Sequence, residues 1–213
     1  MILKNLDNNV LAYVKAAVFL LALSPLLNLG YAAFMDMLGA NPIEKITRTT
    51  GYWTLTFLLI TLTATPLKRL TGWNWLTRLR RMLGLFAFFY GSLHFLTYLV
   101  LDQFFDFDAI FQDIRKRPYI TIGFPSFVLM IPMAVTSSDT MIRRLGGKHW
   151  RILHRLVYLC ATGGVIHYWW LVKKDLTNPI IFAVLLSLLF GIRLISWYFS
   201  RHKQPLVPHP TLS

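Results

Sequence analysis

The stretch MLGLFAFFYGSLHFLTYLVL, residues 82–101, decides the fold of this chain. It contains no Asp, Glu, Lys or Arg. A helix needs about 20 apolar residues to cross the ~30 Å hydrocarbon layer of a bilayer, so this stretch predicts a membrane-spanning helix. Its one histidine, His94, is a polar group that a purely structural helix would not need.

Five more stretches of the same kind fill the rest of the chain. Of the 213 residues 55% are hydrophobic, and the mean hydropathy is +0.51, which excludes a soluble domain of this size. Because no repeat or linker divides the chain, we predict one domain over residues 1–213, an all-α integral membrane bundle of six transmembrane helices. The predicted spans are residues 11–33, 49–67, 82–101, 118–136, 150–172 and 178–199.

Basic residues gather on one side of the predicted bundle. The formal charge of +13 would suggest nucleic acid in a soluble protein, but here Lys and Arg lie beside apolar stretches. The side with loops 68–81 and 137–151 and both termini takes 15 of the 22 basic residues and 2 of the 9 acidic ones. Since loops rich in Lys and Arg stay in the cytoplasm, both termini are predicted to be cytoplasmic. Part of the excess is expected to contact anionic lipid headgroups.

Three of the six histidines, His94, His154 and His167, lie inside strongly apolar stretches. Neutral imidazole is the commonest metal ligand and the usual axial ligand of a b-type haem in a membrane. A single buried histidine is more often a core residue bonded to a neighbouring helix. Ionisable groups inside a membrane are costly and mark functional sites, so three of them make all three histidines candidate metal and cofactor ligands.

Helical spacing pairs His94 with His167. Both spans start on the cytoplasmic side. At about 1.5 Å per residue, His94 lies ~20 Å above Arg81, and His167 lies ~20 Å above His154. The two are therefore predicted to be level and to be the axial ligands of one b haem. His154 lies near the cytoplasmic face, about 140° away from the direction of His167 on an ideal helix. It serves either a second haem or another group, such as a flavin, a quinone or a haem propionate.

Small residues lead up to both histidines on one helical face. They indicate either the two walls of one haem slot or surfaces for close helix packing. The residues are Gly84, Ala87 and Gly91 before His94, and Cys160, Gly163 and Gly164 before His167.

Arg80 and Arg81 lie directly before the third span. A guanidinium fork suits the oxyanions of propionate and phosphate, which makes both arginines candidate cofactor-binding residues. The alternative is that they only set the membrane orientation.

Two further features predict local structure. The connection 102–117 interleaves Asp with Phe, which is typical of an amphipathic segment on the outer surface or of a docking surface for a partner. Pro66 is expected to end a helix, whereas Pro25, Pro125 and Pro132 fall within spans.

Five short motifs, spread over most of the chain, resemble the MsrQ (YedZ) family of haem-binding membrane subunits, within the ferric reductase-like transmembrane group. Each motif alone is a weak signal, and together they are specific. They are Arg78-Leu-Arg-Arg-Met-Leu-Gly84, Leu93-His94, Arg117-Pro-Tyr-Ile-Thr-Ile-Gly123, Gly147-Lys-His-Trp-Arg-Ile-Leu-His154 and Ile166-His-Tyr168.

The resemblance implies a multi-pass protein of the bacterial inner membrane that holds haem b, one or two per chain, and FMN. It implies electron transport from the quinone pool or a cytoplasmic flavin reductase to a periplasmic molybdopterin enzyme, which reduces methionine sulfoxide in oxidised proteins. The family's haem histidines fall at His94, His154 and His167. NADPH oxidases and ferric reductases carry two histidines on each of two helices, and Arg81 stands in the fourth place here.

Substrate chemistry is thus expected in the partner, and this chain is predicted to be the electron-transfer subunit. One alternative is a self-contained reductase that passes electrons directly to ferric iron or oxygen. The other is a non-redox transporter whose intramembrane histidines relay protons or bind a cation, and this alternative predicts a colourless protein.

Overall fold

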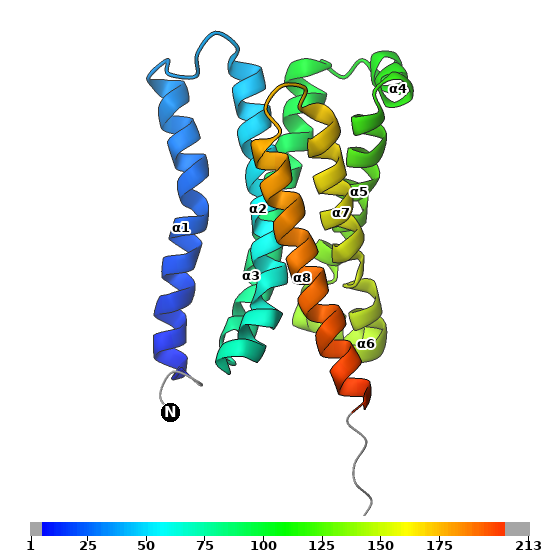
Figure 1. The fold of residues 1–213 in the computed structure, drawn as a ribbon. Coiled ribbons are helices and arrows are strands. Elements are labelled where there is room, and N and C mark those ends of the chain that lie inside the picture. Colours follow the sequence, from blue (N-terminus) through cyan, green and yellow to red (C-terminus); the bar gives the residue numbers. More distant parts are fainter. Residues whose placement is uncertain (1–5, 203–213) are drawn as a thin grey trace, which may run out of the picture.

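The computed structural model describes residues 6–202, and these residues form helices and short connections with no strand among them (Figure 1). The all-α prediction is confirmed. The elements are α1 (Asn8–Phe34), α2 (Pro42–Thr71), α3 (Leu76–Leu96), a π-helical continuation η1 (Thr97–Asp102), α4 (Phe107–Lys116), α5 (Pro118–Val135), α6 (Asp139–Leu153), α7 (Leu156–Leu171) and α8 (Thr177–His202).

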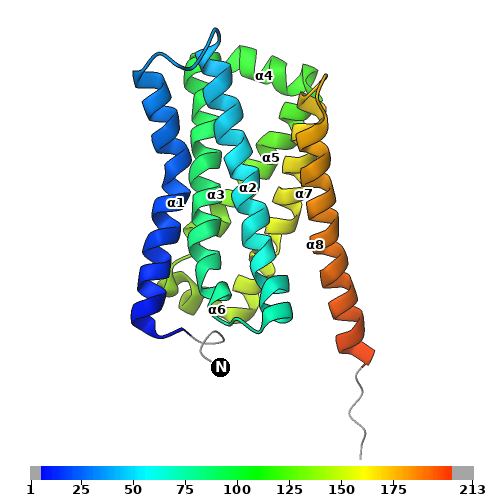
Figure 2. The same ribbon diagram turned by 60° about the vertical axis from the view of Figure 1, so that its left-hand side comes forward.

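The long helices stand side by side in one bundle (Figures 1 and 2). The start of α1, the α2–α3 connection, α6 and the end of α8 lie at one end of the bundle, which we call the basic end. The short helix α4 lies at the opposite end, which we call the α4 end. The described residues nearest both termini thus share the basic end.

Within residues 6–202, four helices are long and apolar enough to cross a membrane: α1, α3 continued by η1, α5 and α8. Helix α7 is apolar but has only 16 residues. Helix α2 has 30 residues, and its many threonines lower its hydropathy.

The threonines of α2 satisfy their own hydroxyl groups. The hydroxyl of Thr50 donates to the carbonyl of Ile46 at 2.8 Å, and that of Thr61 donates to Phe57 at 2.7 Å. A hydroxyl that donates within its own helix can be buried at little cost. This explains how α2 supplies much of the core, with buried residues Thr50, Leu55, Phe57, Leu58, Leu59, Thr61, Leu62, Ala64 and Pro66.

Pro66 does not end a helix, and that prediction is wrong. It lies inside α2, which continues to Thr71. Proline has no N–H, so the carbonyl of Leu62, four residues earlier, loses its helical partner. The guanidinium of Arg193 in α8 donates to that carbonyl at 2.6 Å and stacks over the ring of Tyr158.

The predicted span 150–172 is not one helix. Helix α6 ends at Leu153 and α7 begins at Leu156, with a turn at His154 and Arg155 between them. The physical reason is polarity, because α6 carries charged residues along the basic end and the chain must turn before it enters the bundle. Those residues are Asp139, Arg143, Arg144, Lys148 and Arg151.

Several residues of the small-residue strips pack helices together, as the packing interpretation predicts. A Cβ atom at Gly91 would lie 3.4 Å from the methyl group of Thr54 in α2, and Ala87 is fully buried. In α7, Gly164 lies against Leu55 of α2, and Gly163 lies directly against Ser126 of α5.

The 102–117 connection forms the predicted amphipathic segment at the α4 end. Asp106 caps α4 by accepting from the N–H of Ala109 at 3.0 Å. Helix α4 buries none of its residues, and Phe107 and Phe111 are 65% and 69% exposed.

Candidate metal and cofactor sites

His94 of α3 and His167 of α7 face each other, and we call them the histidine pair. Their ring centroids are 6.0 Å apart, with the ring planes at 83°. Both side chains are partly buried, and they lie toward the α4 end of their helices. The prediction that the two residues are level is confirmed.

Each imidazole of the histidine pair is anchored through Nδ1 to a backbone carbonyl of a neighbouring helix. Nδ1 of His94 lies 2.8 Å from the carbonyl oxygen of Thr47 in α2, and Nδ1 of His167 lies 2.6 Å from that of Tyr119 in α5. A carbonyl oxygen only accepts, so Nδ1 carries the proton in each neutral ring and Nε2 carries the lone pair. Metal-bound histidines in proteins commonly have this arrangement.

The separation of the two rings matches the separation expected of two imidazoles on one metal ion. Metal–imidazole bonds are about 2 Å long and a ring centroid lies about 1 Å inside its nitrogen, so two rings on one ion are separated by roughly 6 Å. The observed separation is 6.0 Å. Two neutral nitrogen donors without thiolate or carboxylate suit the iron of a b-type haem.

His154 is held in the opposite way. Its Nε2 lies 3.1 Å from the hydroxyl of Thr136, which itself donates to the carbonyl of Pro132 at 2.6 Å. The hydroxyl proton is thereby used, so Nε2 donates and the lone pair of the neutral ring is on Nδ1. Trp150 stacks on the imidazole with ring centroids 4.0 Å apart, and its indole N–H donates to the carbonyl of Thr136.

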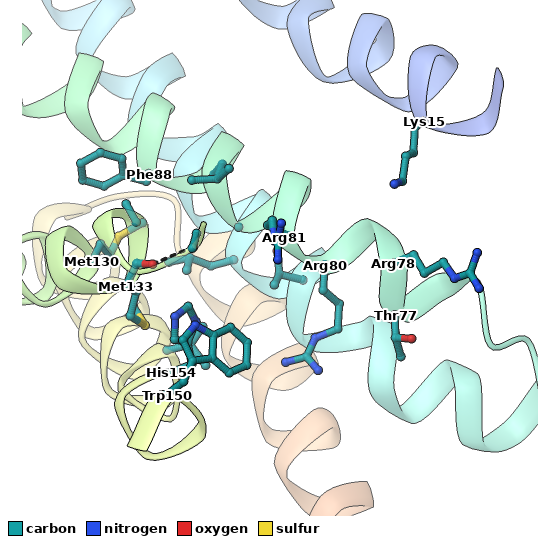
Figure 3. A pocket seen from close by; sticks show the side chains of 17 residues that line it. Lys15, Thr77, Arg78, Arg80, Arg81, Phe88, Met130, Met133, Trp150 and His154 are labelled. Carbon is teal, nitrogen blue, oxygen red and sulfur yellow. Dashed lines mark hydrogen bonds between the residues drawn. The ribbon is translucent and has the colours of Figure 1, made fainter. Parts of the chain in front are cut away.

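A cavity of about 380 Å³ lies in front of His154 at the basic end, and we call it the basic cavity (Figure 3). Its inner wall is apolar, with Leu58, Phe88, Met130 and Met133. The remaining lining residues are Lys15, Thr61, Thr77, Arg78, Arg80, Arg81, Gly84, Leu85, Ala134, Ser137, Trp150, His154 and Val157.

Among the described residues, four cationic side chains line the basic cavity, and one of them, Arg81, is neutralised. Arg80 extends from α3 toward the stacked Trp150 and His154, whereas Arg78 points away from them (Figure 3). Arg81 pairs with Asp139 at 2.5 Å, and this contact lowers the pKa of the Asp139 carboxyl group. The basic cavity thus combines an apolar wall with a net positive rim.

A second crevice of about 460 Å³ adjoins the basic cavity. It lies between α1 and α3, and the two share Lys15, Arg78, Arg81 and Leu85. Its other lining residues are all apolar: Phe19, Leu23, Met82, Phe86 and Phe89.

The structure therefore separates the predicted site residues into two places. It brings His94 and His167 together, and it gathers His154, Arg80 and Arg81 around the basic cavity. Thr136 and Trp150, which hold His154, were not predicted as site residues because neither residue type signals a site alone.

The two glycines that face the histidine pair, Gly51 and Gly123, were also missed as site residues. Both are lone glycines inside apolar helices, which is the signal that could have found them.

Known proteins are similar to this chain over most of its length. The model of the family described as ferric reductase like transmembrane component matches residues 50–165, which include His94 and His154. Curated relatives are called protein-methionine-sulfoxide reductase heme-binding subunit MsrQ. The protein of Azospira oryzae is 58% identical over 87% of this chain and 80% of its own length. The protein of Herminiimonas arsenicoxydans is 53% identical over 91% of this chain and 89% of its own length. The protein of Rhodospirillum rubrum is 54% identical over 85% of this chain and 87% of its own length.

Proposed function

This chain belongs to the ferric reductase like transmembrane family and, within it, to the MsrQ haem-binding subunits, and on that premise we propose that it carries electrons through a membrane by way of haem b. The electrons serve a methionine sulfoxide reductase, whose catalytic subunit is a periplasmic molybdopterin enzyme. The chain is the electron-transfer subunit and leaves the substrate chemistry to that partner.

The observation that carries this proposal is the histidine pair. His94 and His167 are the proposed axial ligands of one haem b, since their lone pairs are on Nε2 and their spacing suits one iron. Bound haem would supply a one-electron carrier whose potential depends on its ligands and burial. The protein holds both rings in place and fixes their tautomer.

The basic cavity is the proposed site of FMN. The cavity has an apolar wall for a flat ring and Lys15, Arg78 and Arg80 for a phosphate, and guanidinium groups bind phosphate well. Among the described residues that line it, His154 is the one imidazole, so the cavity supports a flavin better than a second haem with two histidine ligands. His154 would then contact the flavin, and the metal-ligand role predicted for it would fall away.

Quinol is the proposed electron donor. The apolar crevice between α1 and α3 shares four lining residues with the basic cavity, so an isoprenoid tail could lie in the crevice while the ring approaches the flavin site. A cytoplasmic flavin reductase is the competing donor, and its docking would need the exposed basic end instead.

We also propose that α2 and α7 cross the bilayer with α1, α3, α5 and α8, giving six spans in the bacterial inner membrane. The satisfied hydroxyls of α2 and the apolar composition of α7 support this. Placing the basic end in the cytoplasm follows the distribution of Lys and Arg, and it directs the histidine pair toward the periplasm.

A reconstituted assay tests the proposal. The purified chain is reduced anaerobically with a quinol and mixed with the periplasmic reductase and methionine sulfoxide. We expect electron flow with the wild type, none with His94→Ala, and none without the reductase. If the chain alone reduced ferric iron or oxygen as fast as it reduces the periplasmic reductase, the self-contained enzyme would be favoured. A colourless wild type would favour the transporter.

A further inference from the structure

Both rings of the histidine pair lie directly on a glycine of the neighbouring helix. A Cβ atom built on Gly51 of α2 would lie 2.9 Å from Cε1 and 3.0 Å from Nδ1 of His94. One built on Gly123 of α5 would lie 2.5 Å from Nδ1 and 2.9 Å from Cε1 of His167. Real Cβ atoms do not approach so closely, so any side chain at either position would push the ring away.

The two contacts repeat the same geometry on different helices. The carbonyl that accepts from His94 belongs to Thr47, four residues before Gly51, and the one that accepts from His167 belongs to Tyr119, four residues before Gly123. In an α-helix the carbonyl of residue i faces the N–H of residue i+4. The imidazole therefore reaches the second lone pair of that carbonyl only by passing over residue i+4, where a glycine leaves the space.

Other glycines of the bundle do not have this role. An added Cβ atom at Gly191 of α8 would meet nothing within 4 Å, and one at Gly84 of α3 would make an ordinary 3.8 Å contact with Thr61. Gly163 is closed by the side chain of Ser126, which is helix packing and involves no ligand.

We infer that Gly51 and Gly123 are positioning residues: each provides a flat surface on which one proposed axial imidazole lies and donates its Nδ1–H to the carbonyl one turn earlier. This inference rests on the proposed haem ligation. The backbone hydrogen bond fixes the tautomer that exposes Nε2 and raises the basicity of the ligand, which favours ferric over ferrous iron.

Alanine substitutions test the effect on haem. Loss of such a hydrogen-bond partner commonly weakens metal binding about 10- to 100-fold, and Gly51→Ala and Gly123→Ala are expected to lower haem affinity in that range. Haem that remains should have a higher midpoint potential and altered EPR g-values, because the rings are displaced. Gly191→Ala is the matched control and should behave as wild type. Wild-type haem content, potential and g-values in both variants would overturn the inference.

A double-mutant cycle on the haem-free protein gives an independent test. The chain has a single cysteine, Cys160, which is buried, so a thiol-reactive fluorophore reports unfolding in detergent. Gly51→Ala should lower Tm when His94 is present. In the His94→Ala background it should leave Tm unchanged or raise it, because alanine is the better helix former once the ring is gone.

The same reversal is expected for Gly123→Ala with and without His167→Ala. An equal fall of Tm in both backgrounds would show that the glycines only pack helices and would overturn the inference. A colourless wild type that still shows the reversal would contradict the proposed function while leaving the ring-on-glycine contact established.

Discussion

The histidine pair and the basic cavity hold the same residue type in opposite ways. His94 and His167 are each tied through Nδ1 to a backbone carbonyl and leave Nε2 free, whereas His154 is tied through Nε2 to the hydroxyl of Thr136 and leaves Nδ1 free. Each imidazole of the histidine pair faces the other imidazole, whereas His154 faces cations and an apolar wall. Under the proposed function, the anchor and the opposing groups distinguish a histidine that ligates a metal from one that binds an organic cofactor.

The largest expected effect separates the two regions directly. His94→Ala and His167→Ala should each reduce haem affinity by more than about 100-fold. Loss of only the hydrogen-bond partner of a metal ligand already lowers metal affinity about 10- to 100-fold, and these substitutions remove the ligand itself. His154→Ala should retain the full haem content. A pyridine haemochrome assay with the reduced-minus-oxidised spectrum measures all three. If His154→Ala loses as much haem as the other two, the two regions are not distinct.

The next effect concerns the flavin proposed to bind in the basic cavity. Arg80→Gln removes the guanidinium that extends toward His154, and FMN retention should fall about 10- to 100-fold, as expected for a charge-assisted hydrogen bond worth roughly 1.5–3 kcal/mol. Arg81→Gln should have a smaller effect because Arg81 is already paired with Asp139. The control is Arg144→Gln, an exposed residue of α6 that lines no part of the cavity.

FMN content is read by fluorescence after acid release, with haem content measured on the same samples. Equal FMN loss in the Arg144 control would mean that overall positive charge retains the flavin. Haem loss in the Arg80 variant would show that the histidine pair and the basic cavity belong to one site.

A third prediction concerns the backbone of α2 at the depth of the basic cavity. Arg193→Met leaves the Leu62 carbonyl without a donor and should destabilise the protein by about 1–3 kcal/mol, the usual cost of an unsatisfied buried group. Pro66→Ala restores the helical N–H, so the same arginine substitution should then cost less. Thermal unfolding of the four proteins in the cycle measures this coupling, and additive effects would show that Arg193 does not substitute for the missing helical bond.

The smallest expected effect comes from Thr136→Val. It removes the acceptor of His154 Nε2 and should change FMN affinity by about tenfold or less, since one net hydrogen bond contributes roughly 1 kcal/mol. The midpoint potential of the haem at the histidine pair should not change. A shifted haem potential would reveal contact between the two regions.

Much of the fold could be predicted from hydropathy alone. Long apolar stretches predicted helices that the structure contains, and helical rise correctly placed His94 level with His167. The prediction for Pro66 was wrong because the donor that replaces its missing N–H, Arg193, lies 127 residues away in sequence and only tertiary structure reveals it. The turn at His154 was missed because apolar residues on both sides of it mimic one continuous span.

The site was predicted only in part. Residue type identified the three histidines and the two arginines, but the anchors of the histidine pair are backbone carbonyls, which every residue has and no sequence pattern marks. The supporting glycines are visible in the sequence, yet their meaning depends on which neighbouring helix carries the imidazole.

The most direct test of the two-region account is the low-temperature EPR spectrum of the oxidised protein, recorded for the wild type and for His154→Ala. We expect a low-spin ferric signal with two imidazole ligands in both proteins, with the same amplitude per chain. A high-spin wild-type signal, or loss of the low-spin signal in His154→Ala, would contradict the assignment of His94 and His167 as the haem ligands.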